Sequence, residues 1–215
     1  MKLVSVNVGL PREVKWKGRV VTTGIFKEPV AGDVRVRTLN LDGDRQADLS
    51  VHGGPDKAVY LYPSEHYDYW HGELPGVELP WGMFGENLTS AGLSEEEVHI
   101  GDRFRVGSSE MEVSQPRMPC YKLAVKFGRD DILKRFLASG RTGFYLRVLA
   151  EGQLATGAVI APIKRASASV PVAEIARLYR DGTDNADVLR RVAAIEALAD
   201  GWRDYFRGRL EKLRS

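Results

Sequence analysis

The chain has 215 residues, of which 43% are hydrophobic and 28% are charged, which is typical of an ordinary globular protein rather than a disordered one. Its formal net charge of +2 gives no case for nucleic acid or an anionic membrane as a partner. The segment MKLVSVNVGLPREVKW at the start lacks the long apolar core of a signal peptide, and no stretch approaches a bilayer span. A single cysteine cannot form an internal disulfide, which fits a reducing compartment, so we expect a cytoplasmic protein.

Short strands separated by glycine and proline dominate residues 1–167. Alternating apolar and polar residues predict strands over Lys2–Val8, Asp33–Leu39, Ala58–Tyr62, Arg103–Val106, Met111–Val113, Phe144–Leu149 and Ala158–Ile163. Helices are expected to interrupt them at Ser64–His71, Tyr121–Phe127 and Asp130–Leu137. Many short strands with few long periodic segments favour a closed or partly closed β-barrel.

The pattern changes at residue 168, where apolar residues begin to recur at helical spacing. Three stripes are formed by Val172, Ile175, Ala176 and Tyr179, then by Val188, Val192 and Ile195, and then by Trp202, Phe206, Leu210 and Leu213. We therefore predict a mainly β, α+β protein with a barrel domain at residues 1–167 and a small three-helix unit at 168–215. The stripes indicate core or docking surface rather than a ligand site.

The first segment rich in polar residues is GDRQADLSVHGGPDKAV, residues 43–59. Its polar members are Asp44, Arg45, Gln46, His52, Asp56 and Lys57. The adjacent Gly53 and Gly54 let backbone N–H groups converge on an anion or a cofactor edge, and His52 could donate a hydrogen bond to the same group. A hairpin with a capping histidine and solvated charges is the alternative explanation.

The second segment is GMFGENLT, residues 82–89. Glu86 and Asn87 follow a glycine that allows a tight turn, so both side chains could point into a common cavity. Taken alone, the segment is better explained by a purely structural turn.

The third segment is VSQPRMPCYKLAVKF, residues 113–127. A predicted strand runs into Pro116 and Pro119, which stiffen the connection. Cys120 follows directly at the start of a predicted helix, where the macrodipole favours the anionic form of the thiol, and Arg117 and Lys122 favour it too. A thiolate is a soft metal ligand or a nucleophile, whereas the alternative is a buried and inert cysteine.

Several other kinds of site find little support. A zinc site would need two to four Cys or His ligands at short spacing, but the histidines at positions 52, 66, 71 and 99 are scattered. The sequence contains no P-loop, no G-x-G-x-x-G and no G-x-S-x-G motif. A cysteine hydrolase or transferase that uses Cys120 and His52 stays open on spacing alone.

Together the three segments resemble the MOSC domain, named after the C-terminal domain of molybdenum cofactor sulfurases. The resemblance is carried by GDRQADLSVHGGPDKAVYLYP, HYDYW, FGENL, GDRFRVG and VSQPRMPCYKL, in this order. It extends from about residue 20 to about residue 165 and is greatest to the YiiM-like branch, which adds three helices after the barrel. The loop TLNLDGD departs from the pattern, because many relatives have a glycine where Asn40 or Leu41 stands here.

The resemblance implies a β-barrel that holds a molybdenum–pterin cofactor, with Cys120 as the protein ligand to the metal. Within the T-G-I-x-K element, Thr23 and Lys27 are implied to belong to the site of the cofactor phosphate. The resulting assignment takes Cys120, His52, Asn87 and Arg117 as catalytic, and Thr23, Lys27, Gly53, Gly54, Asp56, Lys57, Glu86 and Gln115 as cofactor-binding. All the polar motif residues are predicted to border one pocket with Cys120.

Members of the YiiM-like branch reduce N-hydroxylated compounds, including hydroxylamino purines, with electrons from a separate flavoprotein. The same small-molecule reduction is expected here, and the chain has no flavin, iron–sulfur or pyridoxal-phosphate module of its own. Two alternatives stay open: a carrier of the molybdenum cofactor or of sulfur on Cys120, and the cofactor-independent cysteine hydrolase or transferase. The helical tail is expected to serve packing, docking of the reductase or formation of a homodimer.

Overall fold

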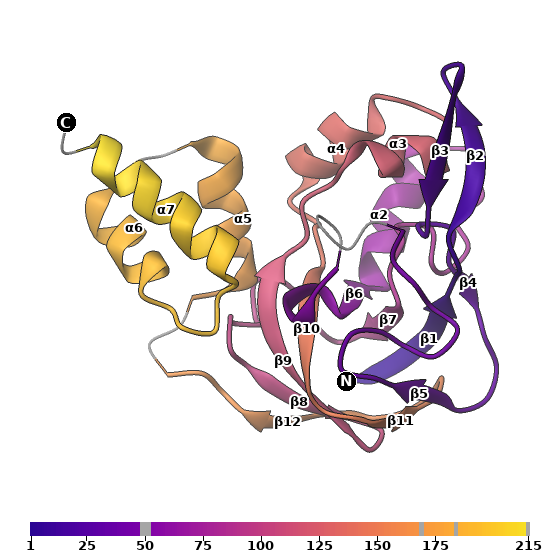
Figure 1. Ribbon diagram of the computed structural model, residues 1–215, viewed down its shortest axis with the longest axis horizontal. Helices are drawn as coiled ribbons and strands as arrows, with labels where there is room; N and C mark the ends of the chain where they lie inside the picture. Colours follow the sequence, from indigo (N-terminus) through magenta and orange to yellow (C-terminus); the bar gives the residue numbers. More distant parts are fainter. Residues whose placement is uncertain (48–52, 168–169, 183–184, 214–215) are drawn as a thin grey trace.

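The computed structural model describes residues 1–47, 53–167, 170–182 and 185–213. An eight-stranded mixed sheet forms its centre, and the three C-terminal helices gather on one side of it (Figure 1). The strands across the sheet are β12 (Ile160–Lys164), β8 (Arg103–Val106), β9 (Ser109–Pro116), β10 (Phe144–Ala150), β6 (Val59–Pro63), β7 (Leu88–Ala91), β1 (Lys2–Val8) and β4 (Glu28–Pro29). Only β6 and β7 pair in parallel, and β6 is buried along its whole length.

The expected α+β class is confirmed, but the ladders of the described residues do not form a closed barrel. The first strand pairs along its length with β7, and only its beginning reaches the segment before β12. There Lys2 and Val159 form an isolated bridge, and the Leu3 amide donates to the Ala158 carbonyl at 2.9 Å. The architecture is therefore a large mixed sheet with C-terminal helices.

Two small two-stranded sheets accompany the large one. One pairs β5 (Val34–Val36) with β11 (Gly152–Leu154), and the other is a hairpin of β2 (Arg12–Trp16) and β3 (Arg19–Thr23) that the sequence analysis did not predict. The two residues at the hairpin turn, Lys17 and Gly18, have φ values of 49° and 76°. Positive φ at both central positions is the type I′ geometry that suits tight hairpins.

Three helices pack between the hairpin and the sheet (Figure 1). They are α2 (Glu65–Glu73), α3 (Tyr121–Phe127) and α4 (Ile132–Ser139), close to the predicted ranges, and a short 3₁₀ turn, η1, covers Pro55–Lys57. Their apolar faces join an aromatic core that includes Tyr62, Trp70, Phe84 and Phe136. Stacked and edge-to-face rings such as these stabilise a core beyond the area they bury.

The helical unit, residues 170–213, consists of α5 (Val172–Asp181), α6 (Ala186–Ala193) and α7 (Asp200–Lys212), as predicted. Its buried residues Ile175, Val192 and Phe206 belong to the same apolar core as the sheet, so the unit is packed on the main domain. The Ala199 amide, just before α7, donates to the Ser114 carbonyl of β9 at 3.2 Å. In the described part of the chain, no helix combines the length and apolar character needed to cross a membrane.

Candidate functional site

A pocket, called here the cysteine pocket, opens where the end of β3, the strands β6 and β10 and the segment before α3 meet. The side chains and glycines that line it are Thr23, Gly24, Ile25, Lys27, Arg45, Gln46, Ala47, Lys57, Tyr60, Gly85, Asn87, Arg117, Met118, Cys120, Lys122 and Tyr145. Six of these residues belong to the predicted site: Thr23, Lys27, Lys57, Asn87, Arg117 and Cys120.

The thiol of Cys120 stands at the N-terminal end of α3. Pro119 fixes the preceding backbone, Cys120 itself is extended with φ −116° and ψ 170°, and its carbonyl accepts the first helical hydrogen bond from the Leu123 amide at 2.9 Å. The residue is half-buried and lines the pocket. The local sequence thus brings a single sulfur to the pocket wall.

The pocket wall carries five cationic side chains, Lys27, Arg45, Lys57, Arg117 and Lys122, and no carboxylate among the described lining residues. A concave surface lined by one sign of charge concentrates ions of the opposite sign. The pocket therefore suits an anionic group, such as a phosphate, close to the thiol.

Arg117 is the most deeply placed of these cations, with only 5% of its surface exposed. Its guanidinium carbon lies 4.8 Å from the ring centre of Phe136 and 5.2 Å from that of Tyr60. Burial lowers the pKa of Arg117, but nearby Tyr60, Tyr145 and Cys120 raise it more, so the net pKa is above its ordinary value. Its Nη1 has no hydrogen-bond partner within the described residues. A buried donor without a partner is costly, so this atom is available to an anionic ligand.

The floor of the pocket is a buried polar cluster around Asp44. This carboxylate pairs with the Lys27 ammonium and accepts hydrogen bonds from the Gly9 amide at 3.0 Å and from Asn87 Nδ2 at 2.9 Å. Asn87 Oδ1 accepts from the Tyr60 amide at 3.1 Å, so both ends of this amide are already occupied. Burial lowers the pKa of Lys27, and Asp44 opposes that effect.

Two further side chains offer protons inside the pocket. Burial lowers the pKa of Lys57, while Asp56 and Cys120 act in the opposite direction, so its ammonium is more acidic than that of an exposed lysine. Burial raises the pKa of Tyr145, and Arg117 limits the rise, so its hydroxyl stays protonated at neutral pH. Both groups can therefore donate to a ligand oxygen.

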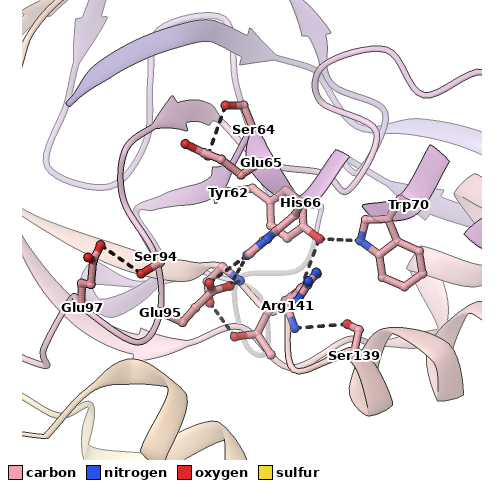
Figure 2. Close-up of polar contacts among 12 residues, drawn as sticks. Tyr62, Ser64, Glu65, His66, Trp70, Ser94, Glu95, Glu97, Ser139 and Arg141 are labelled. Atoms are coloured by element: carbon pink, nitrogen blue, oxygen red, sulfur yellow. Dashed lines mark hydrogen bonds and ion pairs between the residues drawn. The ribbon is translucent and has the colours of Figure 1, made fainter. Parts of the chain in front are cut away.

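A second polar cluster surrounds His66 and Glu95, and Figure 2 shows these two side chains directed toward each other. Glu95 Oε1 accepts from the Gly143 amide at 2.6 Å, and Glu95 Oε2 lies 2.8 Å from His66 Nε2. The Gly143 carbonyl in turn accepts from the Arg117 amide at 3.3 Å. This chain of contacts fixes the backbone that carries Arg117, which gives His66 a structural function.

The other predicted residues lie elsewhere. Gly53, Gly54, Asp56 and Gln115 line a neighbouring groove that meets the cysteine pocket at Lys57, the residue common to both. This aromatic groove is completed by residues of the helical unit, chiefly Tyr179, Trp202 and Tyr205. His52 lies outside the described residues. None of the other three histidines, at positions 66, 71 and 99, lines the cysteine pocket.

Glu86 lines neither cavity, because its carboxylate is fully buried and holds a turn together. It accepts hydrogen bonds from the Tyr67 hydroxyl at 2.5 Å, from the Gly82 and Phe84 amides at 2.8 and 3.1 Å, and from the Thr89 hydroxyl at 3.0 Å. Burial raises its pKa, and these donors oppose the rise. The segment GMFGENLT thus has a structural carboxylate beside a pocket-lining amide.

Sequence reasoning did not assign Arg45, Tyr60, Lys122 and Tyr145 to the site, although all four line the pocket. Arg45 and Lys122 lie within the polar segments 43–59 and 113–127, and this position could have assigned them to the site. Tyr60 and Tyr145 pair across β6 and β10, a relation that no local pattern indicates. Within the described residues, no group of three or more His, Cys, Asp or Glu side chains could hold a metal ion without other ligands.

Comparison with known proteins gives two family matches and several full-length relatives. Residues 48–161 match the MOSC domain, and residues 170–213 match the YiiM-like, 3-alpha helix domain. The chain is 41% identical over 211 residues to the uncharacterised protein YflK of Bacillus subtilis, which covers 98% of this chain and 95% of that protein. A protein of Gibberella moniliformis named reductase is 36% identical over 166 residues, which are 76% of this chain and 29% of that protein.

Among solved structures, the crystal structure of YiiM from Geobacillus stearothermophilus superimposes with a TM-score of 0.82 at 38% sequence identity. The match covers 97% of this chain and 98% of that one, so the sheet and the helical unit are both included.

Proposed function

The chain belongs to the MOSC domain family and carries the YiiM-like three-helix domain, and on this premise we propose that it is a molybdenum-dependent reductase of N-hydroxylated compounds such as hydroxylamino purines. The observation that carries the proposal is the single thiol of Cys120 in a pocket lined by five cations and no carboxylate among its described residues. A relative that bears the name reductase is consistent with it.

The donor set of the pocket fits a molybdenum–pterin cofactor. A thiolate is a good ligand for a soft, redox-active metal, and the cationic side chains suit the phosphate of the pterin. Arg117 Nη1, buried and without a partner in the described part of the chain, offers a directed donor for that anion. Cys120 would ligate the metal, and Arg45, Arg117 and Lys122 would hold the phosphate. When bound, the cofactor supplies the two-electron chemistry that amino-acid side chains lack.

The reaction breaks the N–O bond of an N-hydroxyl group, consumes two electrons and two protons, and yields the amine and water. The electrons come from a separate flavoprotein reductase. One proton has to reach the departing oxygen, and Lys57 is the group that we assign to this task, because its lowered pKa makes it a stronger acid than an exposed lysine. Tyr145 holds a proton at its hydroxyl and orients the same oxygen.

The test compares the wild-type protein with Cys120→Ser, prepared in a host that makes the pterin cofactor and matched for molybdenum content. A serine oxygen is a harder and less acidic donor, so we expect the rate with a hydroxylamino base and a chemical reductant to fall by about 100-fold or more. Tyr121→Phe is the matched control, since Tyr121 follows Cys120 directly, is 52% exposed and does not line the pocket.

Full activity of Cys120→Ser would remove the thiol from the mechanism. Wild-type activity in protein from a host unable to make the pterin would favour the cofactor-independent hydrolase or transferase. Transfer of the cofactor to an acceptor protein without any turnover would favour the carrier.

A further inference from the structure

The aromatic groove is lined by a cluster of ring side chains from the helical unit. Three rings of the helical unit line it, those of Tyr179, Trp202 and Tyr205. Their centroids are 5.4 to 6.3 Å apart, and their planes are inclined by 64°, 47° and 81°, so the rings are not stacked face to face. Tyr179 and Tyr205 are 41% and 40% exposed, whereas Phe206 beneath them is fully buried.

Phe206 anchors α7 in the core, and Trp202 is partly buried against the same core, whereas Tyr179 and Tyr205 are the more exposed rings of the three. Ring faces that remain uncovered next to a cavity bind flat apolar or heteroaromatic groups, and tyrosine and tryptophan are the residues best suited to do so. The groove is open to solvent and has a volume of about 500 Å³, which leaves room for a flat ring against its wall.

The groove also has polar lining residues. Gln115 of β9 lines the groove with only 5% of its surface exposed. The Asp56 carboxylate next to it is held by Arg147, whose Nε donates to Asp56 Oδ1 at 2.8 Å. An amide and a carboxylate can recognise the N–H and ring-nitrogen groups on the edge of a heteroaromatic base.

The aromatic groove borders the cysteine pocket. Lys57 lines both the aromatic groove and the cysteine pocket, so the two cavities are adjacent at this residue. The hydrogen bond from the Ala199 amide to the Ser114 carbonyl fixes the start of α7 against β9, beside Gln115.

We propose that the aromatic groove is the subsite for the heteroaromatic ring of the substrate, with Tyr179, Trp202 and Tyr205 stacking on the ring and Gln115 and Asp56 reading its edge. The inference rests on the proposed reductase function and gives the helical unit a share in substrate recognition. The N-hydroxyl group of the ring then extends past Lys57 towards Cys120.

The kinetic test compares a hydroxylamino purine with N-hydroxyurea, which has no ring, using the full chain with its cofactor and a chemical reductant. In Trp202→Ala and Tyr205→Ala the KM for the purine should rise about tenfold or more, while the kcat/KM for N-hydroxyurea stays within about twofold. Trp202→Phe retains a ring and should keep most of the affinity. Leu213→Ala is the matched control, because Leu213 follows the same helix, is 44% exposed and does not line the groove.

A binding test separates this inference from the proposed function. Adenine, an unreactive aminopurine, is titrated by calorimetry into cofactor-free protein whose fold is checked by circular dichroism. We expect binding to the wild type and to Leu213→Ala, and a loss of about tenfold or more in Tyr205→Ala. If the wild type reduces neither substrate, the proposed function fails. The adenine titration still shows whether the groove binds a heteroaromatic ring.

Three results would overturn the subsite. They are unchanged adenine binding in Tyr205→Ala together with an unchanged purine KM in Trp202→Ala and Tyr205→Ala, an equal loss for the purine and N-hydroxyurea, or a loss confined to turnover driven by the flavoprotein. The first would mean that the ring binds elsewhere, the second that the rings only support the fold, and the third that the groove receives the electron donor.

Discussion

The replacement of Asp44 by asparagine tests how strongly the pocket floor depends on one carboxylate. In the wild type this carboxylate is 1% exposed at its side chain and faces the 8% exposed side chain of Lys27. Asp44→Asn keeps the shape but leaves the Lys27 ammonium with the more distant Glu86 as its remaining counter-charge. Removal of one partner from a buried ion pair typically costs about 3–5 kcal/mol.

The structure sets an upper limit to this cost. Lys27 can escape the penalty by losing its proton, and deprotonation of a lysine with an ordinary pKa of 10.5 at pH 7 costs about 5 kcal/mol at 1.36 kcal/mol per pH unit. We therefore expect the free energy of unfolding to fall by about 3–4 kcal/mol at pH 7, measured by urea denaturation with circular dichroism. Asp42→Asn is the control, because the Asp42–Arg37 pair is 51% and 42% exposed and its loss should leave the free energy of unfolding nearly unchanged.

The pH dependence gives the sharper check. In Asp44→Asn the native Lys27 is neutral at a pH where the unfolded chain still binds its proton, so the stability of the variant rises with pH. The difference from wild type should shrink by up to about 1.4 kcal/mol per pH unit above neutrality. The double variant Lys27→Met/Asp44→Asn should recover at least about 2 kcal/mol, because it removes the buried charge. A loss below about 1 kcal/mol in Asp44→Asn, or no recovery in the double variant, would refute this reasoning.

Two further predictions concern the same region. Lys126 has a pKa of about 8 in the fold, against 10.5 ordinarily, because it is buried. Between these two pKa values the unfolded chain binds more protons than the folded one, so the stability of the wild type rises with pH. Lys126→Met should flatten this rise, and equal slopes of unfolding free energy against pH in both proteins between pH 7.5 and 9.5 would contradict the prediction. A Cβ at Gly24 would lie 2.4 Å from the Arg45 carbonyl oxygen, so Gly24→Ala should displace the pocket wall and reduce molybdenum retention, whereas Gly72→Ala, with open space around it in α2, should be neutral or slightly stabilising. Equal retention in both glycine variants, measured by metal analysis, would argue against a cofactor role for that wall.

The local sequence was sufficient to predict the position of Cys120, because everything that sets it lies within a few residues. Pro119 stiffens the chain, the apolar stripe after it forms α3, and Gly128 ends the helix in a left-handed conformation with φ 66°. The three C-terminal helices were predictable for the same reason. The hairpin of β2 and β3 was missed because both its strands are largely exposed, and the apolar alternation in β2 is limited to Val14 and Trp16.

The relations between distant residues could not be predicted from the sequence. Tyr179 and Leu213 continue apolar stripes that were expected to be core or docking surface, and they are 41% and 44% exposed, because a stripe does not tell where the partner surface ends. Likewise, the predicted single pocket is divided. Arg117 and Cys120 line one cavity, while Gln115, five positions before Cys120, lines the other.

The neighbours Glu86 and Asn87 explain how this pocket acquires its net charge. Glu86 lines neither cavity, and its carboxylate accepts four hydrogen bonds from the surrounding turn. Asn87 lines the pocket, but its amide is occupied by Asp44 and by the β6 backbone. Asp44 in turn compensates Lys27 below the surface. The acidic residues Asp44 and Glu86 are thus buried in hydrogen bonds and an ion pair below the pocket, whereas Arg45, Arg117 and Lys122 line its wall. A motif with balanced charge in the sequence therefore presents a cationic cavity beside a thiol, and substitutions of the floor should alter stability first and anion affinity second.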